Sequence, residues 1–277
     1  MLRERTLVAA LLLPIALLVI HFGGLFYSTV ITFLLLIAAW EYIKLLQVMG
    51  FQPSSGIILG GILILTQSRV FLDFWMADLI LTLILFSVVT SHLLIYENGG
   101  EKTGGDLGTT FSVILYIGWL GSYLISLRNS SLGMWWTYLI LSIVWLSDTG
   151  AYLLGTKFGK RKLSPRLSPN KTWEGYVGGI LFGVLGSVGL VLLFENQFSS
   201  GINLTLIEGG VLGLIISSLI PLGDLAESMI KRQAGAKDSG YLFPGHGGMF
   251  DRLDTLIWAA PTGFYLLNYL IPFLKNL

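Results

Sequence analysis

The sequence predicts an all-α, polytopic integral membrane protein with about nine transmembrane helices. Of its 277 residues, 54% are apolar and only 12% are charged, whereas soluble chains average about 25% charged residues. The apolar runs are long and continuous, without the alternation of polar and apolar residues that marks membrane β-barrel strands. Because a spanning segment must satisfy its own backbone hydrogen bonds, we expect these runs to be helices.

The expected helices follow one another along the whole chain. Their approximate ranges are 6–22, 25–46, 56–68, 74–96, 107–127, 132–155, 175–194, 207–230 and 251–274. The third range is short for the roughly 20 residues that a bilayer requires, so we expect it to be tilted, broken or re-entrant. We divide the chain into an N-terminal region, 1–127, of about five transmembrane helices and a C-terminal region, 128–277, that carries the polar motifs.

Composition excludes several kinds of site. The chain has no cysteine and only three histidines, so it contains neither a disulfide nor a thiolate metal site, and its scattered histidines do not form a zinc motif. The net charge of +1 gives no support to nucleic-acid binding.

Polar chemistry is concentrated between the last two expected helices. Residues 228–254, preceded by Asp224 and Glu227, combine carboxylates, cations and glycines. Carboxylates bind Mg²⁺ together with phosphate oxygens, and lysine and arginine neutralise phosphate charge. Asp224/Glu227 and Asp251/Asp254 are each three residues apart, so one helical face can present both members of a pair. Such a loop can also carry charges only to set topology, but carboxylates at the ends of apolar helices are costly and usually functional.

Two further polar motifs lie in the C-terminal region. Asp148 interrupts the apolar run 132–155, where a carboxylate is a functional candidate or, alternatively, a structural hydrogen-bond or ion-pair partner. The basic loop 157–171 leads to Lys171 and Thr172 at an expected helix start, where free amides and a partial positive charge can hold a phosphate. The alternative is a capped helix that follows a topology-setting loop.

The order and spacing of these residues resemble the signature of the phosphatidate cytidylyltransferases (CDP-diacylglycerol synthases). The resembling segments are Ser228, Lys231-Arg232, Lys237-Asp238, Pro244–Gly248 and Asp251–Asp254, together with SDTGAY at 147–152 and SPNKTWEG at 168–175. The resemblance implies transfer of a cytidylyl group from CTP to phosphatidic acid, giving CDP-diacylglycerol and pyrophosphate. It also implies Mg²⁺ as cofactor, alone or with a second cation.

The resemblance and the residue chemistry together suggest roles for individual side chains. The expected metal ligands are Asp224 and Asp251, with Glu227 and Asp254 as further ligands. The expected catalytic residues are Asp148, Lys171, Lys237, Asp238 and His246. The expected substrate-binding residues are Thr172, Glu174, Ser228, Lys231, Arg232, Gly245, Gly247, Gly248 and Arg252. Because a phosphate monoester is already ionised near neutral pH, no strong general base is expected.

The positive charges orient the expected helices. With a cytoplasmic N-terminus, only Arg69, Arg128 and Lys275 lie outside, which is the bias that the positive-inside rule predicts. This orientation places the motif loops in the cytoplasm, where CTP is available. Glu41, near the end of the second expected helix, is interpreted as an interfacial residue without a catalytic role.

The expected partners are CTP, phosphatidic acid and the lipid bilayer. The small-residue spacing in 175–194 favours close helix packing, either within the chain or in a homodimer. Pro221 is expected to kink or loosen its helix, so that Asp224 is directed at a metal.

Two other function classes remain open on sequence alone. Another CTP-using lipid enzyme, such as a polyprenol kinase or an ether-lipid cytidylyltransferase, would share the carboxylates, the cations and the spans. A secondary transporter would also carry intramembrane carboxylates and broken helices. The gathering of charges at helix ends and the lack of an evident inverted repeat favour an enzyme.

Overall fold

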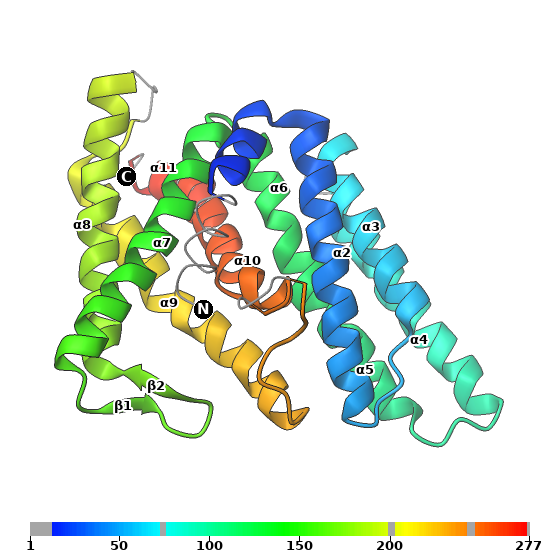
Figure 1. The fold of residues 1–277 in the computed structure, drawn as a ribbon. Coiled ribbons are helices and arrows are strands. Elements are labelled where there is room, and N and C mark those ends of the chain that lie inside the picture. The colour runs from blue at the N-terminus through cyan, green and yellow to red at the C-terminus, as the bar shows by residue number, and fades with distance from the viewer. Residues whose placement is uncertain (1–12, 73–75, 199–202, 243–246, 276–277) are drawn as a thin grey trace. The chain divides into compact units, whose positions relative to one another are not determined.

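The computed structural model describes residues 13–72, 76–198, 203–242 and 247–275. Its elements are α2 (Gly24–Val48), α3 (Ser55–Phe71), α4 (Met76–Glu97), α5 (Thr103–Val113), the π-helical η1 (Ile114–Leu120), α6 (Gly121–Asn129), α7 (Gly133–Phe158), β1 (Lys162–Ser164), β2 (Ser168–Thr172), α8 (Trp173–Phe198), α9 (Leu206–Gln233), α10 (Phe250–Tyr265), the π-helical η2 (Leu266–Leu270) and α11 (Ile271–Lys275). Figure 1 shows this succession of helices and the small β-hairpin.

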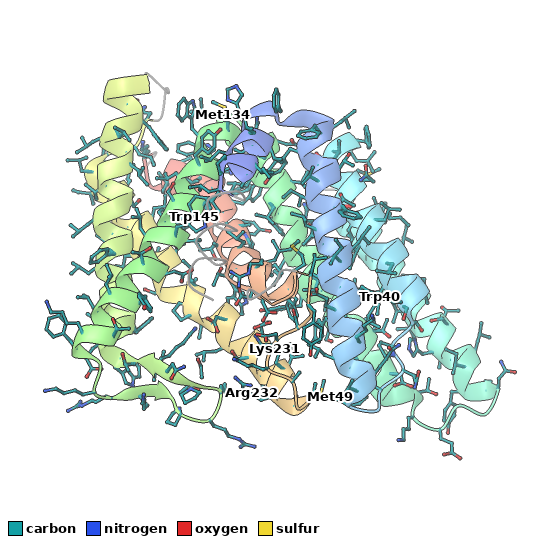
Figure 2. The ribbon with its side chains drawn as sticks, viewed as in Figure 1. Trp40, Met49, Met134, Trp145, Lys231 and Arg232 are labelled. Atoms are coloured by element: carbon teal, nitrogen blue, oxygen red, sulfur yellow. The ribbon has the colours of Figure 1, made fainter. Side chains whose placement is uncertain are left out.

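The helices confirm the predicted all-α membrane fold. Within the described ranges, seven helical segments are long and apolar enough to cross a membrane, and two shorter apolar helices, Leu13–Phe22 and Ser55–Phe71, account for the remaining expected spans. Large apolar side chains such as Trp40 and Trp145 are exposed, as is usual for helices that face lipid (Figure 2). The chain is therefore an integral membrane protein, although the count of nine spans is approximate.

The chain forms two compact parts. The first part comprises Met1–Ser126 and Ile230–Leu253, and the second comprises Leu127–Met229 and Asp254–Leu277. Both α9 and α10 contribute residues to each part. The functional division at residue 127 stays a prediction.

In the first part, α3 packs against α2, α4 and η1. Fully buried aliphatic side chains, among them Leu35 of α2, Ile62 of α3 and Ile117 of η1, form its core. The Tyr27 hydroxyl donates a hydrogen bond of 3.1 Å to the Leu124 carbonyl oxygen, which ties α2 to α6. Arg69, expected outside by charge counting, is buried, and its guanidinium lies 4.5 Å from the centre of the Trp119 ring.

In the second part, α7 and α8 pack closely along glycine-rich faces. A Cβ atom at Gly178 would lie only 2.7 Å from Leu154 Cβ, and one at Gly179 would lie 3.1 Å from the Ser147 carbonyl oxygen. The packing predicted from the spacing of small residues in 175–194 is thus used within the chain. It gives no independent support to a homodimer.

Local capping explains where α9 begins and ends. Glu208 Oε2 accepts a hydrogen bond from the Thr205 amide and Thr205 Oγ1 accepts one from the Glu208 amide, which is the reciprocal capping box. Lys231 and Arg232 occupy the last turn, where cations interact favourably with the helix dipole (Figure 2). Gly235, with φ of 68°, adopts the left-handed conformation that commonly terminates a helix.

The structure differs from the sequence predictions in several local features. The short third span is a continuous helix, α3. Helix α9 continues through Pro221 without a break, and the predicted kink there stays a prediction. The connection between the expected helices 74–96 and 107–127 is shorter than the sequence predicted, because α5 already begins at Thr103. The basic loop 157–171 contains an antiparallel hairpin in which Lys162 pairs with Thr172 and Ser164 with Ser168.

Candidate functional site

The main candidate site is a pocket of about 680 Å³ in the second part. It is lined by α7, the β-hairpin, the start of α8 and the middle of α9, with one residue from α10. Four of the predicted functional residues, Asp148, Lys171, Thr172 and Asp224, line it. The structure therefore brings together motifs that lie far apart in the sequence.

Two carboxylates, Asp148 and Asp224, and two lysines, Lys162 and Lys171, line this pocket, and the buried Asp254 lies close to it. Lys171 Nζ lies 2.6 Å from Asp224 Oδ2. The Lys171 side chain is 26% exposed and the Asp224 side chain is 35% exposed. Asp148 interacts electrostatically with Asp224 and Lys171, and Asp254 interacts with the same two residues and with Asp148. We call Asp148, Asp224, Asp254 and Lys171 the acidic cluster.

The backbone explains why these groups are close. A Cβ atom at Gly223 would overlap the Asp254 carbonyl oxygen and lie 2.6 Å from Trp258 Cδ1, so glycine is required where α9 meets α10. This approach places Asp224, the next residue, beside Asp254. Asp254 is only 7% exposed, and its Oδ1 accepts a hydrogen bond of 2.7 Å from the Thr255 amide.

The start of α8 fixes Lys171 at the pocket. Buried Thr172 accepts a hydrogen bond of 3.1 Å from the Gly175 amide through Oγ1, as an N-cap residue does. Glu174, predicted to bind substrate, accepts hydrogen bonds from the Lys160 and Arg161 amides at 3.1 and 3.2 Å. Both interactions hold the hairpin against the helix, and substrate binding by Glu174 stays a prediction.

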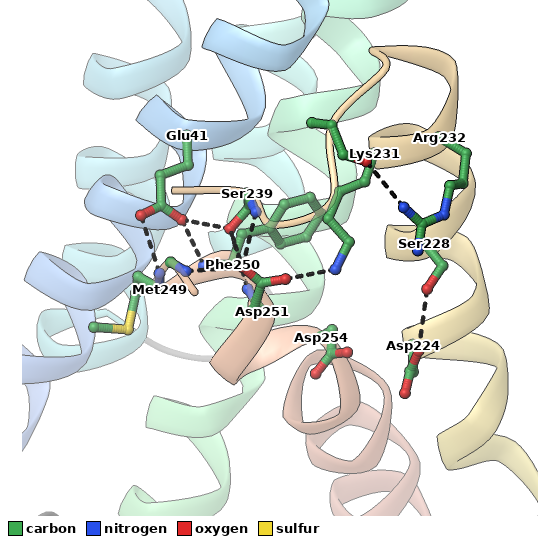
Figure 3. A network of polar contacts seen from close by, with 12 residues as sticks. Glu41, Asp224, Ser228, Lys231, Arg232, Ser239, Met249, Phe250, Asp251 and Asp254 are labelled. Carbon is green, nitrogen blue, oxygen red and sulfur yellow. Dashed lines mark hydrogen bonds and ion pairs between the residues drawn. The ribbon is translucent and has the colours of Figure 1, made fainter. Parts of the chain in front are cut away.

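A second polar cluster lies in the first part and surrounds Asp251 (Figure 3). Asp251 Oδ1 lies 2.5 Å from Lys231 Nζ. Asp251 Oδ2 accepts hydrogen bonds of 2.8 Å from the Ser239 amide, the Ser239 hydroxyl and the Gly248 amide. Unlike the carboxylates of the acidic cluster, Asp251 is surrounded by donors.

Glu41 belongs to this second cluster, which the sequence analysis did not anticipate. It is only 8% exposed and accepts hydrogen bonds from the Ser239 hydroxyl and the Met249 and Phe250 amides. Its surroundings are therefore not those of the solvated interfacial carboxylate that we expected. A carboxylate within the last two turns of an apolar helix was the available signal, whereas Ser239 gave none.

The remaining predicted residues are found in varied surroundings. Ser228 donates a hydrogen bond of 3.3 Å to Asp224 Oδ1, and Glu227 is buried at 1% exposure. Arg232 donates to the Ala236 carbonyl oxygen at 3.2 Å. The side chains of Lys237, Asp238 and Arg252 are exposed. Gly247, with φ of 78°, adopts a conformation that favours glycine, and Gly245 and His246 lie outside the described residues.

The acidic cluster fits a divalent cation that brings further ligands with it. Among the residues the structure describes, no group of three or more His, Cys, Asp or Glu side chains is placed to hold a metal ion by itself. Mg²⁺, however, is usually bound through one or two carboxylates, and water and substrate phosphates complete its coordination. Asp148 and Asp224 offer two hard oxygen ligands in the pocket, which is the number of carboxylates that commonly hold Mg²⁺.

Comparisons with known proteins show the family of the chain. The model of the Cytidylyltransferase family matches residues 3–270. A protein of Synechocystis sp. named phosphatidate cytidylyltransferase is 30% identical over 307 residues, with 99% of each chain covered. Proteins of the same name from Staphylococcus saprophyticus and Bacillus subtilis are 36% and 33% identical, covering 97% and 85% of this chain and 98% and 88% of theirs. Since these matches extend over most or nearly all of the sequence, the chain belongs to the cytidylyltransferase family.

Proposed function

We propose that this protein transfers a cytidylyl group from CTP to phosphatidic acid, giving CDP-diacylglycerol and pyrophosphate. The observation that carries the proposal is the pocket in which Asp148, Asp224 and Lys171 meet, in a membrane protein of this family. A pocket at the ends of apolar helices suits a reaction between a nucleotide and a lipid headgroup. Family membership also favours an enzyme over a transporter.

The reaction is a displacement at phosphorus. A phosphate oxygen of phosphatidic acid forms a bond to the α-phosphorus of CTP, and the bond from that phosphorus to the bridging oxygen of pyrophosphate breaks. Both reactants are anionic, so the barrier depends on charge neutralisation and positioning. Lys171 supplies one ammonium group at the pocket, and the amides at the start of α8 supply further positive potential.

We propose that Mg²⁺ serves as cofactor and that Asp224 and Asp148 would hold it in the pocket, with Asp254 as a buried neighbour. When bound, the ion neutralises phosphate charge and stabilises the leaving pyrophosphate. Asp148 and Asp224 would repel a triphosphate, and a divalent cation between them and the phosphates would offset this repulsion together with Lys162 and Lys171. Metal binding by Asp251 and Glu227 stays a prediction, since Asp251 already accepts hydrogen bonds from several donors.

The other predicted residues are proposed contacts for substrate anions. Exposed Lys237, Arg232 and Arg252 offer positive charge for the triphosphate or the lipid headgroup. We further propose that the N-terminus and the motif loops face the cytoplasm of a bacterial-type cell membrane. The support is the charge bias of the loops, together with the bacterial sources of the relatives. A homodimer stays a prediction.

The decisive experiment follows radiolabel from CTP into phosphatidic acid in detergent. α-Labelled CTP should give a labelled lipid with Mg²⁺ present and none after chelation, and Asp224→Asn should reduce the transfer. γ-Labelled CTP distinguishes a lipid kinase, which would transfer that label instead. No α-label in lipid from a folded protein with an accessible lipid substrate would refute the proposal.

A further inference from the structure

The segment between α9 and α10 depends on a residue almost two hundred positions away. Glu41, near the end of α2, approaches it so closely that two of its glycines are needed for space. A Cβ atom at Gly240 would overlap Glu41 Oε1, and one at Gly248 would overlap Oε2 and Ser239 Oγ. The glycines therefore serve this approach, whether or not they also serve a ligand.

Glu41 caps the start of α10. Its Oε1 accepts a hydrogen bond of 3.0 Å from the Met249 amide, and its Oε2 accepts one of 2.9 Å from the Phe250 amide. The first amides of a helix have no partner within the helix, and a negative charge there interacts favourably with the helix dipole. The neighbouring Tyr42 ring stacks on the Phe250 ring, with centroids 5.2 Å apart, which supports the same junction.

Ser239 links Glu41 to Asp251. The Ser239 hydroxyl oxygen lies 2.8 Å from Glu41 Oε2 and 2.8 Å from Asp251 Oδ2. A hydroxyl carries one proton, so it donates to one carboxylate at a time. The distance to both means that any displacement of Glu41 changes the surroundings of Asp251, whose other oxygen pairs with Lys231. Figure 3 shows this chain of contacts.

We infer that Glu41 is a positioning residue, which sets the orientation of Asp251 and Lys231 through Ser239 and through the start of α10. Its two carboxylate oxygens contact Ser239 and the Met249 and Phe250 amides. The inference rests on the proposed function, because the Asp251 pair matters only if these residues act on an anionic substrate. The inference thus assigns a role at these C-terminal motifs to a residue of an N-terminal helix.

Glu41→Gln tests the inference with little change of shape. Glutamine has one acceptor oxygen and one amide donor, so in either orientation its NH₂ group faces an amide of Met249 or Phe250. We expect kcat to fall about 10- to 100-fold, because small displacements in an active site have effects of this size. KM for CTP should change less than about threefold, since the loss concerns positioning and not ground-state binding.

Two further variants separate positioning from stability. Ser239→Ala removes the bridge but keeps the cap, so it should lower kcat while hydrogen exchange at the Met249 and Phe250 amides stays as in the wild type. Glu41→Gln should accelerate that exchange at least about tenfold, because the amides lose an acceptor. Glu208→Gln, in the capping box of α9, is the matched control and should leave both readouts within about twofold.

The outcomes distinguish the inference from the proposed function. If the wild type transfers cytidylyl groups, a Glu41→Gln enzyme within threefold of its kcat overturns the positioning role. If the wild type transfers none, the proposed function fails and the exchange measurement alone decides. Unchanged hydrogen exchange at the Met249 and Phe250 amides in Glu41→Gln then overturns the capping role of Glu41. Faster exchange confined to residues 239–253 supports that role.

Discussion

Lys171→Met tests whether the cation of the acidic cluster serves the substrate or the fold. The Lys171–Asp224 pair is short, at 2.6 Å, but partly exposed, so it contributes only about 1 kcal/mol or less to the free energy of unfolding. A hydrogen bond between an ammonium group and a phosphate contributes about 1.5–3 kcal/mol. At about 1.4 kcal/mol per factor of ten, its loss lowers kcat/KM for CTP by about 10- to 150-fold.

The assay compares initial rates of label transfer with thermal unfolding in the same detergent. Lys160→Met is the matched control, because Lys160 is an exposed cation of the same connection that does not line the pocket. We expect this control to retain wild-type kinetics. A Lys171→Met enzyme within threefold of the wild type would refute the reasoning and would make Lys171 a structural partner of Asp224.

The remaining predictions concern both clusters and the membrane orientation. Asp251→Asn should reduce turnover below about a tenth of the wild-type value, because an amide cannot accept hydrogen bonds from all the donors around Asp251. The control Glu97→Gln, at an exposed position, should leave turnover unchanged. Retained turnover in Asp251→Asn would contradict the assignment of Asp251 to the functional site. Asp254→Asn should lower transfer but leave the unfolding temperature near that of the wild type, because the amide keeps the size of this buried group and still accepts the Thr255 amide hydrogen. A large loss of stability would contradict this expectation. The chain lacks cysteine, so single cysteines introduced at positions 129 and 160 can be labelled without background. A membrane-impermeant maleimide should label Asn129→Cys in intact cells and Lys160→Cys only in inverted vesicles. The reverse labelling pattern would refute the proposed orientation.

The sequence was sufficient to predict the helices and the meeting of distant motifs. Apolar length alone sets the spans, because a membrane permits few other structures for such a run. The candidate residues followed from chemistry: Asp148 and Asp224 are carboxylates in apolar helices, and Lys171 is a cation just before an expected helix start. The structure places all three around one pocket.

What the sequence could not predict depends on three-dimensional pairing. Glu41 looked like an ordinary helix-end carboxylate, because its partners lie about two hundred residues away. The hairpin of the basic loop lacks the alternating apolar pattern that signals a strand; it is held instead by backbone pairing and by Glu174. The helix through Pro221 continues because a proline removes one hydrogen bond but does not oblige a membrane helix to end.

Asp251 and Asp254 show why spacing alone cannot assign roles to carboxylates. Their separation predicts a shared helical face and, by analogy, a shared task. Yet Asp251 is enclosed by donors that hold it in place, whereas Asp254 lies among other carboxylates that repel it. A carboxylate whose acceptor sites are engaged is suited to maintaining geometry, and one among like charges is suited to attracting a cation. Replacing these two aspartates of one signature is therefore expected to have different effects: loss of order at Asp251, and loss of a buried carboxyl group beside the pocket at Asp254.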